Sequence, residues 1–156
     1  MFKIIILTVG KLKTDFYHQA FGEYSKRLGP YSQLEVREVK AESFKERVDR
    51  DKVKRVEGER LLKEIKKISQ GSFFILDERG REYNSRQLAD KLQASQQPLV
   101  FIIGGTLGLA KEILSYPGSQ TLALSQMTLP HELARVVLIE QIYRAVTILK
   151  NKDYHY

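Results

Sequence analysis

The sequence predicts an α/β domain with a largely parallel sheet flanked by helices. Five apolar, strand-like runs occur at about 3–9, 34–39, 73–76, 99–103 and 120–124. Helical patterns separate these runs, and such alternation is typical of βαβ units, in which helices join and cover parallel strands. The chain has 156 residues and no repeat, low-complexity stretch or linker, so we expect one domain over residues 1–156.

The composition narrows the classes of function. A formal net charge of +7 and a pI near 9.5 favour a polyanionic partner, nucleic acid before membrane. The sequence has no cysteine, which excludes disulfides and thiolate metal sites, and its three scattered histidines lack metal-ligand spacing. We therefore expect no metal. The apolar run near the start is too short to span a membrane and has no cleavage site, so we expect a cytoplasmic protein with no membrane partner.

The first strand is apolar enough to be buried on both faces, and a helix follows it. Phe16, Phe21 and Leu28 have helical spacing, a Thr14–Asp15 cap precedes them, and Gly29 and Pro30 end the helix. A second helix is expected at roughly 44–68. Its surface carries many lysines and arginines interleaved with glutamates, which favours a solvated face with ion pairs over the alternative, an RNA contact.

Two further units precede the C-terminal third. After the third strand, residues 77–80 predict a turn, and Asn84 or Ser85 caps a helix that continues to about Ala94. A strand at 99–103 then leads into Gly104, Gly105 and Gly108. Such a loop is typical of nucleotide sites but is also common in plain tight turns, and it is not the dinucleotide-binding pattern. No other nucleotide or hydrolase motif is present.

The last helix, Pro130 to about Lys150, is apolar around almost its whole circumference. Such a helix needs burial on all sides, and one sheet covers only one side. We therefore expect a homodimer centred on this helix, with Ile142, on the face opposite Leu133, at the contact. The alternative is a helix sunk in the core of one chain.

Polar and aromatic residues at the C-terminal end are candidates for chemistry. Glu140 and Arg144 are four residues apart, which fits either an intrahelical ion pair or an arginine aimed at a phosphate or a second protomer. Tyr154, His155 and Tyr156 end the chain beside lysines. They fit either a frayed terminus or a group that stacks on an unpaired base and meets its phosphates.

The whole chain resembles the RlmH group of the SPOUT methyltransferase superfamily. The matching segments are VGKLK (9–13), EYSKRL (23–28), EG (57–58), ILD (75–77), FIIGG (101–105) with Gly108, LSQMTLPH (124–131), RV (135–136), EQIYRA (140–145) and YH (154–155). Members of this group methylate ring nitrogen N3 of a pseudouridine in 23S, large-subunit ribosomal RNA. The resemblance implies a C-terminal trefoil knot, a pocket for S-adenosylmethionine made by the knot, and a homodimer across the last helix.

The resemblance also implies site residues. The cofactor contacts carry over to Leu76, Gly104, Leu124, Ser125, Gln126, Met127, Thr128 and Leu129. The candidate catalytic residues are His155, as base or proton relay, and Arg144, which would stabilise negative charge on the pyrimidine. The candidate substrate-binding residues are Lys11, His131 and Tyr154. Tyr156 stands where members of the group tend to have a basic residue.

Substrate context and competing functions complete the expectations. A domain this small has no separate RNA-recognition module, so we expect the assembled ribosome as the substrate, with ribosomal RNA as the partner. The alternative from another class is an RNA-binding protein without catalysis, which would bind no cofactor. A nicotinamide oxidoreductase is favoured only by the glycine loop.

Overall fold

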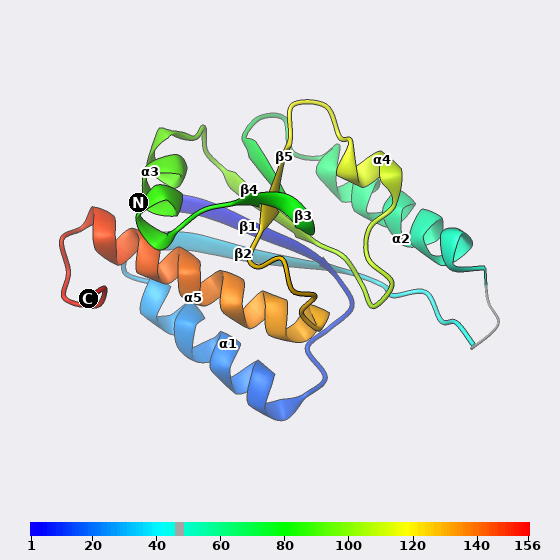
Figure 1. Ribbon diagram of the computed structural model, residues 1–156, viewed down its shortest axis with the longest axis horizontal. Helices are drawn as coiled ribbons and strands as arrows, with labels where there is room; N and C mark the ends of the chain where they lie inside the picture. Colours follow the sequence, from blue (N-terminus) through cyan, green and yellow to red (C-terminus); the bar gives the residue numbers. More distant parts are fainter. Residues whose placement is uncertain (46–48) are drawn as a thin grey trace.

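A five-stranded parallel sheet, ordered β2-β1-β4-β3-β5, forms the centre of the molecule (Figure 1). The strands are β1 (Phe2–Val9), β2 (Ser32–Val39), β3 (Ser72–Glu82), β4 (Leu99–Ile103) and β5 (Gln120–Ala123). The structure is a computed structural model and describes residues 1–45 and 49–156. Every pairing between these strands is parallel, which confirms the predicted α/β class.

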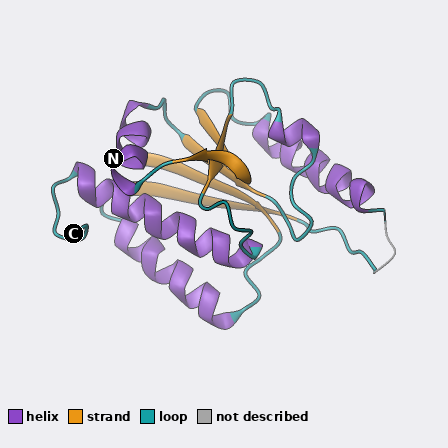
Figure 2. Cartoon of the chain, in the orientation of Figure 1, coloured by secondary structure: helices purple, strands orange, loops and turns teal. Residues whose placement is uncertain are grey.

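Helices cover both faces of this sheet (Figure 2). The helices are α1 (Asp15–Leu28), α2 (Arg50–Ile65), α3 (Ser85–Ala94), α4 (Lys111–Leu114) and α5 (His131–Leu149). On one face α5 lies between α1 and α3, and on the other α2 lies beside α4. Each face of the sheet has its own hydrophobic core. β1 contributes Ile4 and Ile6 to the core beneath α5, and Ile5 and Leu7 to the core beneath α2 and α4. Successive side chains of a strand point to opposite faces, so this strand is buried on both faces, as predicted.

The second helix is shorter than predicted. It begins at Arg50, because the Asp49 carboxylate accepts the backbone N–H groups of Asp51 (3.1 Å) and Lys52 (3.2 Å) and so caps it. Phe44 lies in the preceding loop, and the predicted helical residues 46–48 lie outside the described part of the chain. The predicted start at about residue 44 is therefore wrong.

The predicted turn at 77–80 is also wrong, because β3 continues through it to Glu82. The strand pairs with β5 on both sides of an irregularity between Leu76 and Arg81. Gly80 allows this, since a Cβ there would lie 2.7 Å from the backbone of Thr121 on β5. The turn-forming residues therefore make a bulge within a strand rather than a reversal of the chain.

The last helix buries one side in the core of its own chain and leaves the other partly exposed. Ile142 is 0% exposed, so the expectation that it contacts a second copy is wrong. The reason is that α1 and α3 flank α5 and, with the sheet, cover more of it than a sheet alone. The partly exposed apolar residues of α5 are Leu133, Ala134, Val136, Val137, Tyr143, Ile148 and Leu149.

Within residues 1–45 and 49–156, no helix combines the length and apolar character needed to cross a membrane. The same residues contain no group of three His, Asp or Glu side chains placed to share a metal ion. The C-terminal knot and the domain boundary 1–156 stay predictions.

Candidate functional site

A cavity of about 730 Å³ opens at the carboxyl ends of β4 and β5, beside the irregularity of β3 that follows Leu76. The chain leaves β3 toward α3 on one face of the sheet and leaves β4 toward α4 on the other. Divergent connections of this kind leave a crevice beyond the strand ends, which is where α/β sheets bind ligands. Its volume is in the range of small-molecule and cofactor sites.

Most of the predicted cofactor residues line this cavity. The lining members are Leu76, Gly104, Leu124, Ser125, Met127, Thr128 and Leu129. Gln126 is not among the lining residues, and its side chain is exposed. Met127 is 78% exposed at the edge of the cavity. His131, predicted to bind substrate, also lines it, whereas Lys11 is exposed outside it.

The glycine loop after β4 is folded tightly against itself. Gly108 has a φ of +86° and donates its N–H to the carbonyl of Gly105 at 3.0 Å. At Gly104 a Cβ would lie 2.9 Å from Leu109 Cγ and 3.0 Å from the Gly108 backbone. The loop therefore needs glycine at 104 to reach the conformation that forms one wall of the cavity.

Replacing Gly104 with alanine should lower the affinity of the cavity for its predicted cofactor, S-adenosylmethionine, at least tenfold, because the new Cβ displaces Leu109 and Gly108. Isothermal calorimetry measures this. Gly22→Ala is the matched control, since no atom lies within 4 Å of a Cβ at this helical position. It should bind like wild type and gain up to about 1 kcal/mol in stability. Equal affinities for the two variants would contradict the assigned role of Gly104.

Short polar contacts order the segment between β5 and α5. The backbone N–H of Met127 donates to Ser125 Oγ at 3.0 Å. The Thr128 hydroxyl donates to Glu78 Oε2 at 2.6 Å and so joins this segment to β3. The segment is thus held against the cavity, with backbone groups next to the apolar side chains of Leu124 and Leu129.

Two ionisable groups in the cavity have shifted pKa values. The side-chain hydrogen bond from Arg79 lowers the pKa of Asp77, and its Nε lies 2.9 Å from Oδ1. Burial lowers the pKa of His131 below its ordinary value, and the effect of nearby Arg135 has the same sign, while Glu132 opposes it. The cavity therefore holds a neutral imidazole at neutral pH.

The lowered pKa of His131 predicts a pH dependence of stability. The unfolded chain binds a proton at this residue near pH 6.5 and the folded chain only at lower pH, so the free energy of unfolding should fall as pH drops below about 6.5. His131→Gln should remove this loss between pH 6.5 and 5, a window above the ordinary carboxylate range. Urea titrations at several pH values measure the difference. Parallel pH profiles for the two proteins would contradict the assignment.

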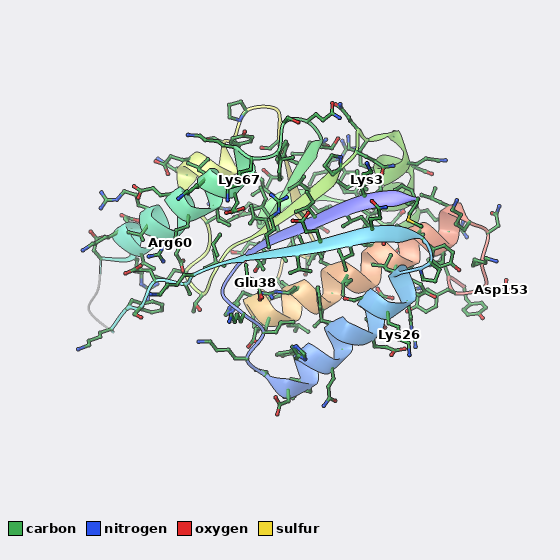
Figure 3. The ribbon with its side chains drawn as sticks, turned by 180° about the vertical axis from the view of Figure 1, so that it is seen from behind. Lys3, Lys26, Glu38, Arg60, Lys67 and Asp153 are labelled. Carbon is green, nitrogen blue, oxygen red and sulfur yellow. The ribbon has the colours of Figure 1, made fainter. Side chains whose placement is uncertain are left out.

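Residues in the first turns of α5 fasten the turn that carries Lys11. The Glu132 carboxylate accepts the N–H groups of Lys13 and Thr14 and the Thr14 hydroxyl. Arg135, 1% exposed, donates to the Gly10 carbonyl at 2.9 Å and pairs with Glu38 (2.9 Å) of the edge strand β2, labelled in Figure 3. Lys11 therefore projects from a fixed turn. Sequence reasoning missed Glu132, whose acidic position in the first turn of α5 is the available signal.

The buried carboxylate of Glu57 packs against the glycine loop at Gly105. Sequence reasoning assigned it no role in the site. Glu57 is 5% exposed, and a Cβ at Gly105 would lie 3.0 Å from its Oε1. Burial raises its pKa, although the N–H of Glu42, which it accepts at 3.1 Å, opposes the shift. Glu57 therefore contacts the loop and the segment after β2 at once.

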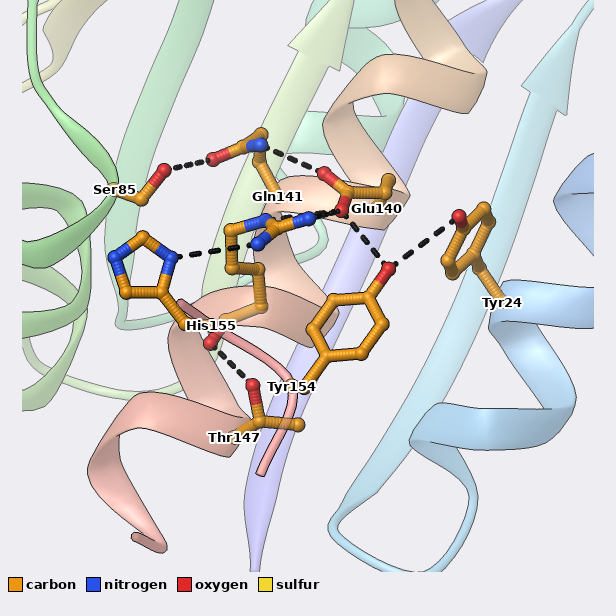
Figure 4. Close-up of polar contacts among 8 residues, drawn as sticks. Tyr24, Ser85, Glu140, Gln141, Thr147, Tyr154 and His155 are labelled. Carbon is orange, nitrogen blue, oxygen red and sulfur yellow. Dashed lines mark hydrogen bonds and ion pairs between the residues drawn. The ribbon is translucent and has the colours of Figure 1, made fainter. Parts of the chain in front are cut away.

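The C-terminal tail folds back on the outer side of α5 (Figure 4). Arg144 donates to Glu140 Oε1 from NH2 (2.6 Å) and from Nε (3.0 Å), so the expected ion pair is present. The other terminal nitrogen of Arg144 lies 3.3 Å from Nδ1 of His155, and its guanidinium lies 4.6 Å from the ring centre of Tyr154. The tail is therefore held by Arg144 and is not a frayed end.

Tyr154 joins this cluster to α1. Its hydroxyl donates to Glu140 Oε1 at 3.0 Å and lies 3.5 Å from the hydroxyl of Tyr24. Burial raises the pKa of the Tyr154 phenol, and its hydrogen bonds to Tyr24 and Glu140 raise it further. Gln141 extends the network by joining Glu140 (2.7 Å) to Ser85 on α3 (2.8 Å).

Within one chain, the predicted cofactor residues at the cavity lie far from the predicted catalytic residues Arg144 and His155. Arg144 follows His131 by thirteen residues on α5, which places it about 20 Å further along the helix axis. The cavity lies at the start of α5, while Arg144, Tyr154 and His155 lie at its end. The cavity and the tail residues are therefore separate within one chain.

The fold and this cavity define the class as an α/β protein with a ligand-sized cavity beyond its sheet, and comparison with known families identifies the group. A family model described as "Predicted SPOUT methyltransferase" matches residues 2–155. The chain belongs to the SPOUT methyltransferase family, which confirms its resemblance to the RlmH group. The fold is similar to that of a probable methylase family protein from Haemophilus influenzae Rd KW20, at a TM-score of 0.57 and 15% identity, over 99% of this chain and 70% of the other.

Proposed function

We propose that this protein transfers a methyl group from S-adenosylmethionine to N3 of a pseudouridine in 23S ribosomal RNA, on the assembled ribosome in the cytoplasm. One observation carries the proposal. In a chain of the SPOUT methyltransferase family, seven of the eight predicted cofactor residues line one cavity at the carboxyl ends of the strands.

The cavity fits the proposed cofactor. Gly104 lets the loop pack against Leu109 and Gly108 as one wall of the cavity, and Leu76, Leu124 and Leu129 offer apolar contact to a flat ring. The backbone of 124–129 offers N–H and carbonyl groups to the edge of an adenine. When bound, S-adenosylmethionine supplies the electrophilic methyl group. The chain positions it and needs no metal to do so, since positioning supplies much of the rate in such a transfer.

The tail provides the groups that suit the pyrimidine. An arginine only donates, so the contact with Arg144 makes Nδ1 of His155 an acceptor and leaves the proton of a neutral ring on Nε2. In this state His155 can donate to a pyrimidine carbonyl oxygen. To take the proton from N3 of the pyrimidine, the imidazole of His155 must release Arg144. The freed guanidinium then stabilises the negative charge on the pyrimidine.

We also propose that the active form is a homodimer across the partly exposed face of α5. Leu133 and Val137 lie on this face together with Glu140 and Arg144. Two copies that pack with their α5 helices antiparallel bring the tail of each chain toward the cavity of the other, which removes the 20 Å separation within one chain. This arrangement follows from the proposed chemistry.

Replacing His155 with alanine should lower methyl transfer to ribosomes by 10²- to 10⁴-fold while S-adenosylmethionine binding stays intact. Transfer of labelled methyl groups measures the first and calorimetry the second. Wild-type assays should compare free ribosomal RNA, large subunits and whole ribosomes, with whole ribosomes expected as the best substrate. Wild-type protein that binds RNA but no S-adenosylmethionine would support the non-catalytic RNA-binding alternative instead.

A further inference from the structure

A second hollow of about 530 Å³ lies beside the cofactor cavity, between the first turns of α2 and the segment around α4. Lys54, Arg79 and Leu109 line both spaces, so the two are continuous at their edges. The cations that line the second hollow are Lys52, Lys54, Arg55, Arg79 and Lys111. Its acidic lining residues are Asp49, Asp51 and Glu112. Cations therefore predominate, and we call this space the basic hollow.

The cations of the basic hollow differ in their ion pairing from those toward the other end of α2. In the second half of α2, Arg60 pairs with Glu42 at 2.6 Å, and Glu64 pairs with Lys67, just past the end of the helix, at 2.6 Å (Figure 3). Within residues 1–45 and 49–156, no ion pair involves Lys54, Arg55 or Lys111. The sequence-based interpretation of α2 as a solvated face with ion pairs is therefore correct for its second half and does not describe its first two turns.

Two cations, Arg79 and Lys54, lie where the basic hollow meets the cofactor cavity. Arg79 is held against Asp77 at 2.9 Å, which keeps its guanidinium at the shared edge of the two spaces. Lys54 is half-buried at the same edge. A phosphate placed there would meet cations on a fixed strand and a fixed helix rather than on a free loop.

We propose that the basic hollow binds the sugar-phosphate backbone of the RNA strand. The phosphates it holds are those next to the target nucleotide, which is presented to the cofactor cavity. The inference rests on the proposed function insofar as RNA is the substrate. None of the described residues that line the hollow is aromatic, so it offers charge to phosphates and no surface for base stacking. Its role is to hold the strand in register without reading its sequence.

The test uses two full-length double variants with the same loss of charge. Arg55→Gln with Lys111→Gln alters the basic hollow and no residue that lines the cofactor cavity. Lys63→Gln with Lys66→Gln alters exposed lysines at the other end of α2 and is the control. A labelled twelve-nucleotide oligouridylate and purified bacterial ribosomes are the probes, and each affinity is measured over a salt series. S-adenosylmethionine binding is measured in parallel.

The hollow variant should bind oligouridylate about 25-fold more weakly at 0.1 M salt, and its salt slope should fall by about 1.4, since each single-strand phosphate contact contributes about 0.7. Its affinity for ribosomes should fall as well, and its affinity for S-adenosylmethionine should equal that of wild type. The control should keep the wild-type slope. Equal losses in both variants, or no RNA binding by wild type, would overturn the inference.

The outcomes also separate this inference from the proposed function. If both double variants bind RNA alike while wild type binds S-adenosylmethionine and methylates ribosomes, the proposed role of the basic hollow is wrong and the proposed function stands. If the hollow variant loses RNA affinity while wild type binds no S-adenosylmethionine, the hollow stands and the proposed transfer is wrong.

Discussion

An equimolar mixture of the Gly104→Ala and His155→Ala proteins should regain about a quarter of wild-type methyl transfer, although each variant alone has little. The first variant has a damaged cofactor cavity and an intact tail, and the second has the reverse. Random exchange of subunits makes half of the dimers mixed, and each mixed dimer contains one complete site out of two. The measurement is transfer of labelled methyl groups to ribosomes after co-refolding or co-expression of the two chains.

This recovery tests whether the tail acts on the cavity of the other chain. If the tail served its own cavity, no dimer in the mixture would contain a complete site, and activity would stay at the level of the single variants. The double variant Gly104→Ala/His155→Ala mixed with wild type is the control. If the tail acts on the partner's cavity, its mixed dimers contain no complete site, and activity should be about a quarter of wild type, all of it from wild-type dimers. If the tail serves its own cavity, each mixed dimer keeps one complete site, and activity should be about half of wild type. The two mixtures differ only in how the lesions are distributed between chains.

Ile142→Asp and Val137→Asp should fail in different ways, although both place a carboxylate on the same apolar helix. Ile142 is fully buried in the core of one chain, so its replacement should cost several kcal/mol and leave the protein unfolded or insoluble. Val137 is partly exposed on the proposed dimer face. Its replacement should leave a folded monomer that binds S-adenosylmethionine and does not methylate ribosomes.

Circular dichroism and sedimentation at assay concentration distinguish these outcomes. Lys150→Asp, at an exposed position just past the end of α5, is the control and should remain a folded dimer. A Val137→Asp protein that sediments as wild type would contradict the proposed interface. A wild-type protein that is monomeric and fully active would contradict the dimer itself.

The order of the elements could be predicted from local patterns alone. The apolar runs of β1 and β4 and the helical spacing in α1 are set by which side chains repeat every two or every three to four residues, so they are visible without any contact. The start of α2 and the course of β3 could not be predicted. The first depends on whether Asp49 turns its side chain onto the helix, and the second on how closely Gly80 passes Thr121.

The candidate site divides in the same way. Seven of the eight residues that the resemblance predicts to bind the cofactor line one cavity, and Gln126 does not. Glu132 and Glu57 were missed, because each acts on a segment distant in sequence, at Thr14 and at Gly105. The basic hollow was missed for a related reason: Arg55 and Lys111 come from different helices, and only their packing brings their charges together.

The sequence by itself determined the parallel α/β class, the extent of most elements and the family, since these follow from side-chain periodicity and from motifs that are local in the chain. Only the tertiary structure decided which side of α5 is available to a second copy. Periodicity shows that a helix is apolar all round, but how much of it α1 and α3 cover depends on where they pack. The same packing places Arg144 and His155 far from the cavity of their own chain, because a rigid helix separates groups in proportion to its length.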